Sequence, residues 1–281
     1  MNKELLLLDK SICMLSDFKV FTNLDLSCIN WDLLFSYGLQ SQSICMFYNK
    51  LVYSDCLKKI PSKYYKLISA IYIGNAHHNQ LLNHTRQLLS NMLSVSGIEL
   101  FEYKNISMDK YFKKNLMPND IDVVARKSNA LEINSFLLSN GYHIKYVNGD
   151  AFVEELPETL NSVFYEKNPI YEYDYPIKID INYSFKRNWF LEHILTDYNK
   201  EERLTRLSLI LISMIDFYEH INCNIDNIKI EDLLKLKRLN IQLNSLNHYE
   251  SNMLFEMANK YDVVSDYSIV RDVVKEYISL F

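Results

Sequence analysis

The hydrophobic positions of this chain follow two different periods, and the change of period divides it into three parts. Up to about residue 95, apolar residues recur every three or four positions, as on the buried side of amphipathic helices. From about 96 to 186 they alternate with polar residues in short runs that are typical of strands, and helical spacing then returns as far as residue 281. We therefore predict an α+β protein in which helical regions over 1–95 and 187–281 flank a core over 96–186 with a small mixed or antiparallel sheet.

The individual elements follow from the apolar runs and the residues that end them. We expect helices over residues 5–15, 30–38, 44–51, 62–73 and 76–95, and in the last part over 189–195, 203–220, 230–239, 249–260 and 269–280. In the middle part we expect strands over 98–103, 120–125, 144–147, 152–155, 162–165 and 177–183, with helices over 108–112 and 128–140. Asn30 and Ser128 are suited to cap the helices that they begin.

The most distinctive local pattern is Asp120-Ile121-Asp122, which runs directly into Val123 and Val124. Successive side chains of a strand point to opposite faces, so the two acids share one side and Ile121 faces the other. Neighbouring carboxylates repel each other and are costly beside a core unless a cation lies between them. Mg²⁺, which prefers oxygen ligands, suits such a pair. The alternative is that Asp120 ends the preceding turn and Asp122 lies on an exposed edge.

A third acid, Asp180, lies in a strand whose isoleucines share the opposite face. If this strand neighbours the first, three carboxylates project from one side of the sheet and could hold two metal ions. In such a site one ion activates an attacking hydroxyl and the other holds a triphosphate. Asp120 and Asp122 would each contact metal, and Asp180 would hold the ion near the nucleophile and help to take its proton. The alternative is that Asp180 is an exposed strand acid.

Composition narrows the classes of function. The 281 residues are enough for a large core, and the net charge of −5 argues against non-specific nucleic-acid binding over a broad surface. Five scattered cysteines without a CxxC pair argue against a disulfide framework and favour a reducing cytoplasm. The apolar run near the N-terminus is too short for a signal peptide core or a membrane span. We expect a cytoplasmic protein without a membrane partner.

Together, these motifs resemble the polymerase-β-like nucleotidyltransferase superfamily, and more closely a group of uncharacterised bacterial proteins described only as a nucleotidyltransferase family. Those proteins combine a helix with the pattern D-W-D-x-L-L, a turn ending in K-G, a D-h-D strand, a helix ending in G-Y and a later h-D-h-H strand. The matching segments here are residues 29–34, 97–105, 120–126, 140–142 and 179–182, in the same order. The resemblance covers roughly residues 25 to 240.

The resemblance implies a metal-dependent enzyme that moves a nucleoside monophosphate from an NTP onto a hydroxyl group and releases pyrophosphate. Asp120, Asp122 and Asp180 match the metal-binding and catalytic acids of the family, with Mg²⁺ or Mn²⁺ as the cofactor. The implied partners are a nucleoside triphosphate and an acceptor, which is a small molecule, a peptide or a protein. Nucleic acid is not expected as a partner.

The resemblance also implies a nucleotide-binding segment with Lys104, Asn105 and Ser107, but here the chain departs from the family pattern. The family has glycine in this turn, which lets the backbone approach a phosphate. This chain has Asn105-Ile106, and Asn tolerates unusual backbone angles better than most residues. Lys104 could instead be a solvated lysine at a strand end, and Ser107 a helix cap. Asn182 stands where the family often has His.

These departures leave a second interpretation open, namely a degenerate member of the same fold that binds a nucleotide or a partner without turnover. A third is an RNA or tRNA-end modifier or a toxin, against which the acidic net charge counts. Arg126, which directly follows the acidic strand, is expected to pair with an acid rather than with a nucleotide.

Overall fold

The computed structural model describes residues 3–21, 25–104, 108–151, 156–157, 159–169, 175–185, 188–201, 206–221 and 224–280. The helices in these residues are α1 (Lys3–Ser11), α2 (Trp31–Gln40), α3 (Ile44–Tyr53), α4 (Ser62–Ser96), α5 (Lys110–Asn115), α6 (Ala130–Ser139), α7 (Asn188–Glu201), α8 (Arg206–His220), α9 (Leu233–Asn244), α10 (His248–Lys260) and α11 (Val264–Leu280). No helix in this part of the chain has the length and apolar character that crossing a membrane requires.

The strands are β1 (Leu100–Glu102), β2 (Ile121–Ala125), β3 (His143–Val147), β4 (Asp150–Ala151), β5 (Ser162–Lys167) and β6 (Ile177–Asn182). Among the described residues they form one sheet in the order β1-β2-β6-β5-β3-β4. Strands β2 and β6 are parallel, and the other neighbouring pairs are antiparallel. The predicted α+β class and mixed, mostly antiparallel sheet are therefore confirmed. The strand predicted over 152–155 falls outside the described residues.

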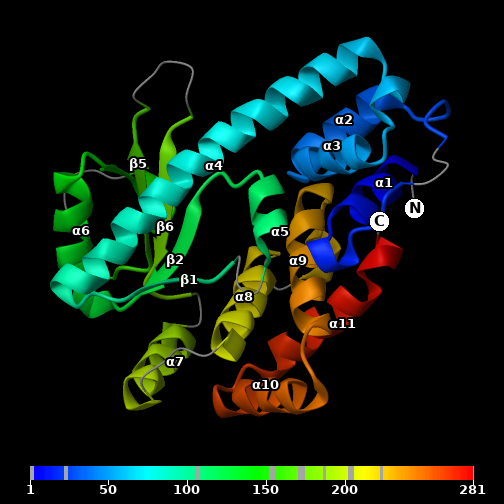
Figure 1. The fold of residues 1–281 in the computed structure, drawn as a ribbon. Coiled ribbons are helices and arrows are strands. Elements are labelled where there is room, and N and C mark those ends of the chain that lie inside the picture. The colour runs from blue at the N-terminus through cyan, green and yellow to red at the C-terminus, as the bar shows by residue number, and fades with distance from the viewer. Residues whose placement is uncertain are drawn as a thin grey trace.

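The two faces of β2 and β6 belong to different hydrophobic cores. Ile121, Val123, Ile179 and Ile181 are buried together with apolar side chains of α4 and α6. Val124 points the other way, into a core formed mainly by the C-terminal helices. Figure 1 shows α4 and α6 beside the sheet, with α7 and α8 below it. Because side chains alternate along a strand, one short stretch such as β2 serves both cores.

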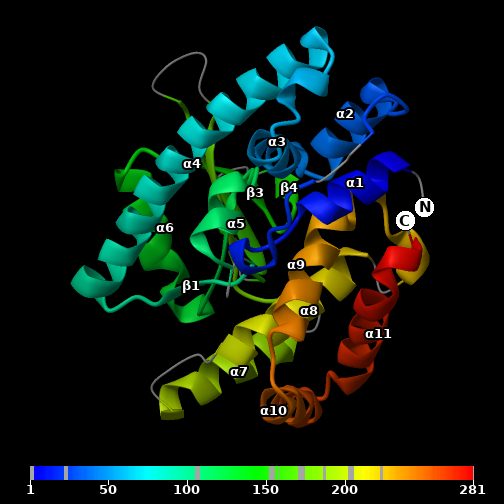
Figure 2. The same cartoon turned by 45° about the vertical axis from the view of Figure 1, so that its right-hand side comes forward.

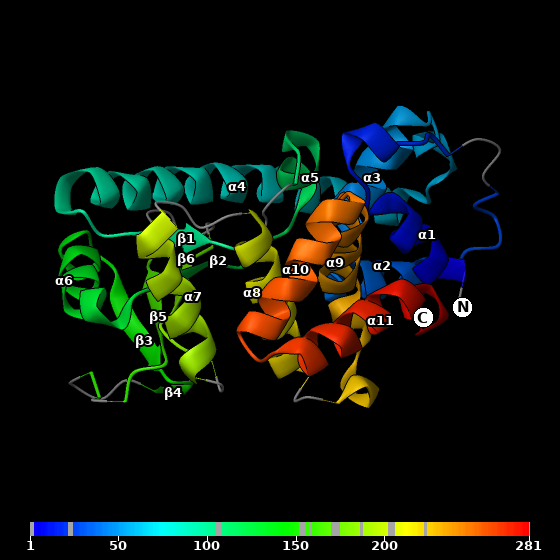
Figure 3. The same ribbon diagram turned by 90° about the horizontal axis from the view of Figure 1, so that it is seen from below.

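Helix α4 connects the sheet to the N-terminal helices. We predicted two helices here, over 62–73 and 76–95, but the structure has one helix of 35 residues that continues through Gly74 and Asn75. Its first half packs through Tyr64 and Ile68 on the core of the N-terminal helices, and its second half packs on the sheet. Contacts at both ends outweigh the low helix propensity of one glycine. Figure 3 shows α4 running from the N-terminal helices to the sheet.

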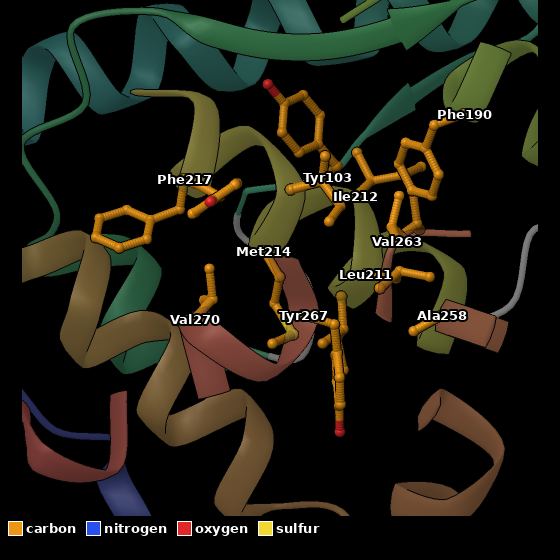
Figure 4. Close-up of a cluster of buried hydrophobic side chains, with 14 of the residues drawn as sticks. Tyr103, Phe190, Leu211, Ile212, Met214, Phe217, Ala258, Val263, Tyr267 and Val270 are labelled. Carbon is orange, nitrogen blue, oxygen red and sulfur yellow. The ribbon is translucent and has the colours of Figure 1, made fainter. Parts of the chain in front are cut away.

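The C-terminal helices are fixed to the end of β1 through α8. Tyr103, which follows β1, is fully buried in their core, and Figure 4 shows its ring beside Ile212 of α8. The hydroxyl of Ser213 donates a hydrogen bond to the Tyr103 carbonyl at 3.0 Å. The residues that directly follow β1 are therefore held against α8.

Two of the predicted helix starts can be compared directly with the structure. Asn30 caps α2, since its side chain accepts a hydrogen bond from the Leu33 amide, as predicted. Ser128 does not cap α6, because it lies in a short 3-10 turn and Asn129 precedes the helix. The first helix also ends earlier than expected, at Ser11.

Candidate active site

The register of the two parallel strands brings the acids together. Asp122 of β2 lies directly opposite Asp180 of β6, as Ile121 lies opposite Ile179. Asp120 immediately precedes β2 and is two residues from Asp122, so it extends the same face. The three acids that the sequence singled out are therefore placed on one side of one sheet, away from the core that holds the isoleucines.

Lys104 provides a positive charge to this face. Its ammonium group donates to Asp122 Oδ1 at 2.5 Å, and it lies 3.6 Å from Asp216 Oδ2. The side chain of Asp122 is only 11% exposed, so the ion pair is largely shielded from water. Burial alone would lower the pKa of Lys104, but Asp122 and Asp216 outweigh it and raise that pKa. Lys104 is thus charged, and it is not a solvated lysine at a strand end.

The acids carry more negative charge than Lys104 balances. Burial, followed by repulsion from Asp122, raises the pKa of Asp180 to about 7. Burial and the charge of Asp122 likewise raise the pKa of Asp120 to about 6, although Lys104 and Lys178 act against this rise. Carboxyl groups with such values exchange protons near neutral pH, which is typical of sites that carry out proton transfer or bind cations.

An acid that the sequence analysis missed belongs to the same cluster. Asp216 lies in α8, where it contacts Lys104 and accepts a hydrogen bond from the Tyr103 hydroxyl at 3.2 Å. Burial, then Asp216 and Asp122, raise the pKa of Tyr103 well above its ordinary value, so the phenol keeps its proton and acts as the donor. The sequence did contain a signal, because Asp216 ends a run from 207 to 215 without any charged residue.

Helix α9 contributes a second cation that the sequence analysis missed. Arg238, Lys235, Lys104 and Asp216 line one small hollow of about 20 Å³. Burial lowers the pKa of Arg238, while the charges of Asp122, Asp216 and Asp120 oppose this change. The guanidinium therefore interacts electrostatically with these three acids. The sequence offers no way to select Arg238 from the neighbouring basic residues of α9.

The neighbours of Arg238 have other partners. Lys237 lies 3.3 Å from Asp9 of α1. Lys235 lies 3.4 Å from Asp232, and its ammonium nitrogen is 2.7 Å from His220 Nε2. The cations of α9 therefore differ in their partners, and for Arg238 it is the charges of Asp120, Asp122 and Asp216 that oppose the lowering of its pKa by burial.

The donor set can be compared with the needs of a metal ion. Within the described ranges, no three His, Cys, Asp or Glu side chains stand close enough together to hold a metal. Asp122 binds the Lys104 ammonium instead. The chemistry nevertheless fits Mg²⁺ or Mn²⁺, because Asp120, Asp122 and Asp180 are carboxylates on one face of the sheet, and repulsion from Asp122 helps to raise the pKa of the other two. The metal site stays a prediction, and forming it requires these side chains to draw together.

The remaining predicted residues have mixed outcomes. Asn105 and Ser107, which the family resemblance implied as nucleotide-binding residues, lie outside the described residues. Arg126 pairs with Glu99, at 3.3 Å between guanidinium and carboxylate, as we predicted. Asn182, the last residue of β6, lies opposite Val124 and shares a face with Asp180.

Comparison with known proteins adds no further information about this site. No protein-family model, no curated protein and no solved structure matches the chain. Any function must therefore be argued from the acids of β2 and β6 and the cations around them.

Proposed function

We propose that the protein is a metal-dependent nucleotidyltransferase that transfers a nucleoside monophosphate from an NTP to a hydroxyl group. The observation that supports this most is the parallel register of β2 and β6, which sets Asp122 opposite Asp180 with Asp120 beside them. Two strands that run in the same direction present acids separated by 58 residues of chain on a single face, next to a buried cation. Such a constellation suits the transfer of a phosphoryl group.

In this proposal the acids and cations have separate tasks. Asp120, Asp122 and Asp180 would hold Mg²⁺ or Mn²⁺, which neutralises the triphosphate and activates the acceptor hydroxyl when bound. Lys104 and Arg238 neutralise the charge on the donor phosphates. Asp180, which would hold the ion on the side of the acceptor, would also help to take the proton of the acceptor hydroxyl. The acceptor oxygen bonds to the α-phosphorus, and pyrophosphate leaves with the electrons of the broken bond.

The test is incorporation of label from each of the four α-³²P NTPs into an acceptor panel of small molecules, peptides and the protein itself, with Mg²⁺ or Mn²⁺. We expect Asp120→Asn/Asp122→Asn to lower the rate by about 10³-fold, equivalent to ~4 kcal/mol of transition-state stabilisation. Circular dichroism would show that the double variant is folded. A double variant with the wild-type rate would rule out these acids as the catalytic residues.

A second candidate function is nucleotide or partner binding without turnover. It is favoured by one observation, that Asp122 Oδ1 is already paired with the Lys104 ammonium group. A cation built into the chain can replace part of the charge that a metal would supply, at the cost of catalysis. Calorimetry with Mg²⁺-ATP and Mg²⁺-GTP separates the two candidates, because binding without product in the labelled assay would favour this one.

A further inference from the structure

A pocket of about 440 Å³ lies at the beginning of the two parallel strands, next to the acids. Its walls come from the segment before β2, the segment before β6 and the middle of α4. The lining residues are Ala70, Ile71, Gly74, Asn75, His78, Met117, Pro118, Asn119, Tyr175, Pro176 and Lys178. Asn119 directly precedes Asp120, and Lys178 shares a face of β6 with Asp180. The volume is within the range of small-molecule sites in proteins.

Gly74 opens this pocket on the side of α4. It lies in the interior of a 35-residue helix, where glycine is the least favourable of the ordinary residues other than proline. A Cβ atom built on Gly74 would meet nothing within 4 Å, so no neighbouring side chain requires the glycine. Gly38 shows the opposite case, because a Cβ there would lie 2.7 Å from Ile44. Packing explains Gly38, whereas Gly74 leaves empty space in the wall of the pocket.

The lining suits a flat ring more than a phosphate. It contains one cation, Lys178, and no carboxylate. Tyr175 is 67% exposed and meets the buried ring of His78 edge to face, at 5.8 Å between the centroids. An exposed aromatic face offers stacking, and the exposed amide of Asn119 offers a donor and an acceptor for the edge of a heterocycle, whereas Asn75 Nδ2 already donates to the Leu116 carbonyl at 2.7 Å.

We propose that this pocket, opened by Gly74 and bordered by Tyr175, binds the nucleobase of the NTP donor. The inference rests on the proposed function and adds the subsite that selects the base. The triphosphate carries several negative charges and belongs with Lys104 and Arg238 on the acidic face. The base is uncharged and fits the pocket beyond Asn119, which joins the two sites through its neighbour Asp120.

The experiment fills the pocket without touching the acids. Gly74→Leu places an apolar side chain into the open space, and Gly74→Ala adds only a methyl group. Gln87→Leu introduces the same residue at an exposed position of α4 outside the pocket and serves as the matched control. Calorimetry would measure the binding of each Mg²⁺-NTP and of Mg²⁺-tripolyphosphate, which has no base.

We expect Gly74→Leu to weaken the binding of the preferred NTP at least tenfold and to leave tripolyphosphate binding unchanged. Gly74→Ala and Gln87→Leu should change NTP binding by less than about threefold. All three variants should keep the wild-type circular dichroism spectrum, since a Cβ at Gly74 meets no atom within 4 Å and Gln87 is exposed.

Two results would count against the inference, and they are distinguishable. If wild-type protein binds NTPs and folded Gly74→Leu binds each of them equally well, the pocket is not the base site, although the proposed function stands. If the wild-type protein binds neither NTP nor tripolyphosphate, the proposed function fails and the base site fails with it.

Discussion

The two faces of strands β2 and β6 differ in the burial and the charge of their side chains. On one face Ile121, Val123, Ile179 and Ile181 are at most 2% exposed and pack on α4 and α6. On the other face lie Asp120, Asp122 and Asp180, which repel one another and of which Asp122 is paired with Lys104. The two sets alternate along the chain, since Ile121 lies between Asp120 and Asp122, and Asp180 lies between Ile179 and Ile181.

The two faces contribute to the stability of the folded protein with opposite signs. The isoleucine face removes apolar surface from water and favours the folded state. The acidic face holds carboxyl groups whose pKa is raised by burial, which means that their charged forms oppose folding at neutral pH. Such acids need a rigid support that holds them in place. The buried isoleucine face of the same two strands provides this support from the opposite side of the sheet.

The largest effect is expected from moving an acid to the wrong face. Ile179→Asp places a carboxylate in a fully buried position without a partner, which should cost at least about 4 kcal/mol of unfolding free energy. Urea denaturation followed by circular dichroism measures this loss. Ile179→Val is the control and should cost only about 1 kcal/mol. Equal midpoints for the two variants would show that the two faces do not differ as described.

A smaller effect is expected from removing the cation of the acidic face. Lys104→Met leaves the largely buried Asp122 without its ion pair, which should cost about 2–3 kcal/mol at pH 8. Adding Asp122→Asn to this variant should restore much of the loss, because the uncompensated charge disappears. A double variant as unstable as the two single losses added together would contradict the pairing.

The smallest effect has the opposite sign and depends on pH. The pKa of Asp180 is raised to about 7 in the folded protein, above its value of about 3.9 in an unfolded chain. Its ionised form therefore costs stability above pH 7, and this cost falls as the pH drops through 7 towards 4.

Asp180→Asn should accordingly stabilise the protein by about 1–2 kcal/mol at pH 8, where its charge is removed. The gain should be smaller at pH 5, where wild-type Asp180 is protonated in the folded protein but still mostly ionised in the unfolded chain, and it should approach zero only below about pH 4. Thermal denaturation at both pH values measures the difference, and a gain that is larger at pH 5 would show that burial and repulsion do not raise this pKa.

Much of the sheet could be predicted because its signals are local. The alternation of isoleucine with polar residues in β6 fixes which side chains share a face, whatever the strand's neighbours are. The parallel pairing of β2 with β6 is different, since it joins segments separated by β3, β4 and β5 along the chain. Alternation alone carries no information about which strands pair or about their register, so the meeting of Asp122 with Asp180 could be expected only as a hypothesis.

The parts of the site that come from the C-terminal helices were missed for a related reason. Asp216 follows a long uncharged run of α8, but its partners Tyr103 and Lys104 lie more than a hundred residues earlier. Arg238 has no local signal at all, because the surface exposure of a basic residue depends on how its helix packs. The continuous helix α4 shows the same limit in reverse, since packing at both ends overrode the break expected at Gly74.

The contacts between α9 and α1 predict how an N-terminal truncation would affect this protein. Its Lys237 reaches Asp9 of α1, and its first turn packs through Leu233 and Leu234 in the same core as Leu8. Figures 1 and 2 show α1 lying against α9, although the two helices are far apart in the sequence. Deleting α1 would therefore remove contacts that hold α9 in place. Because Arg238 belongs to α9, such a truncation would also disturb the surroundings of the acids.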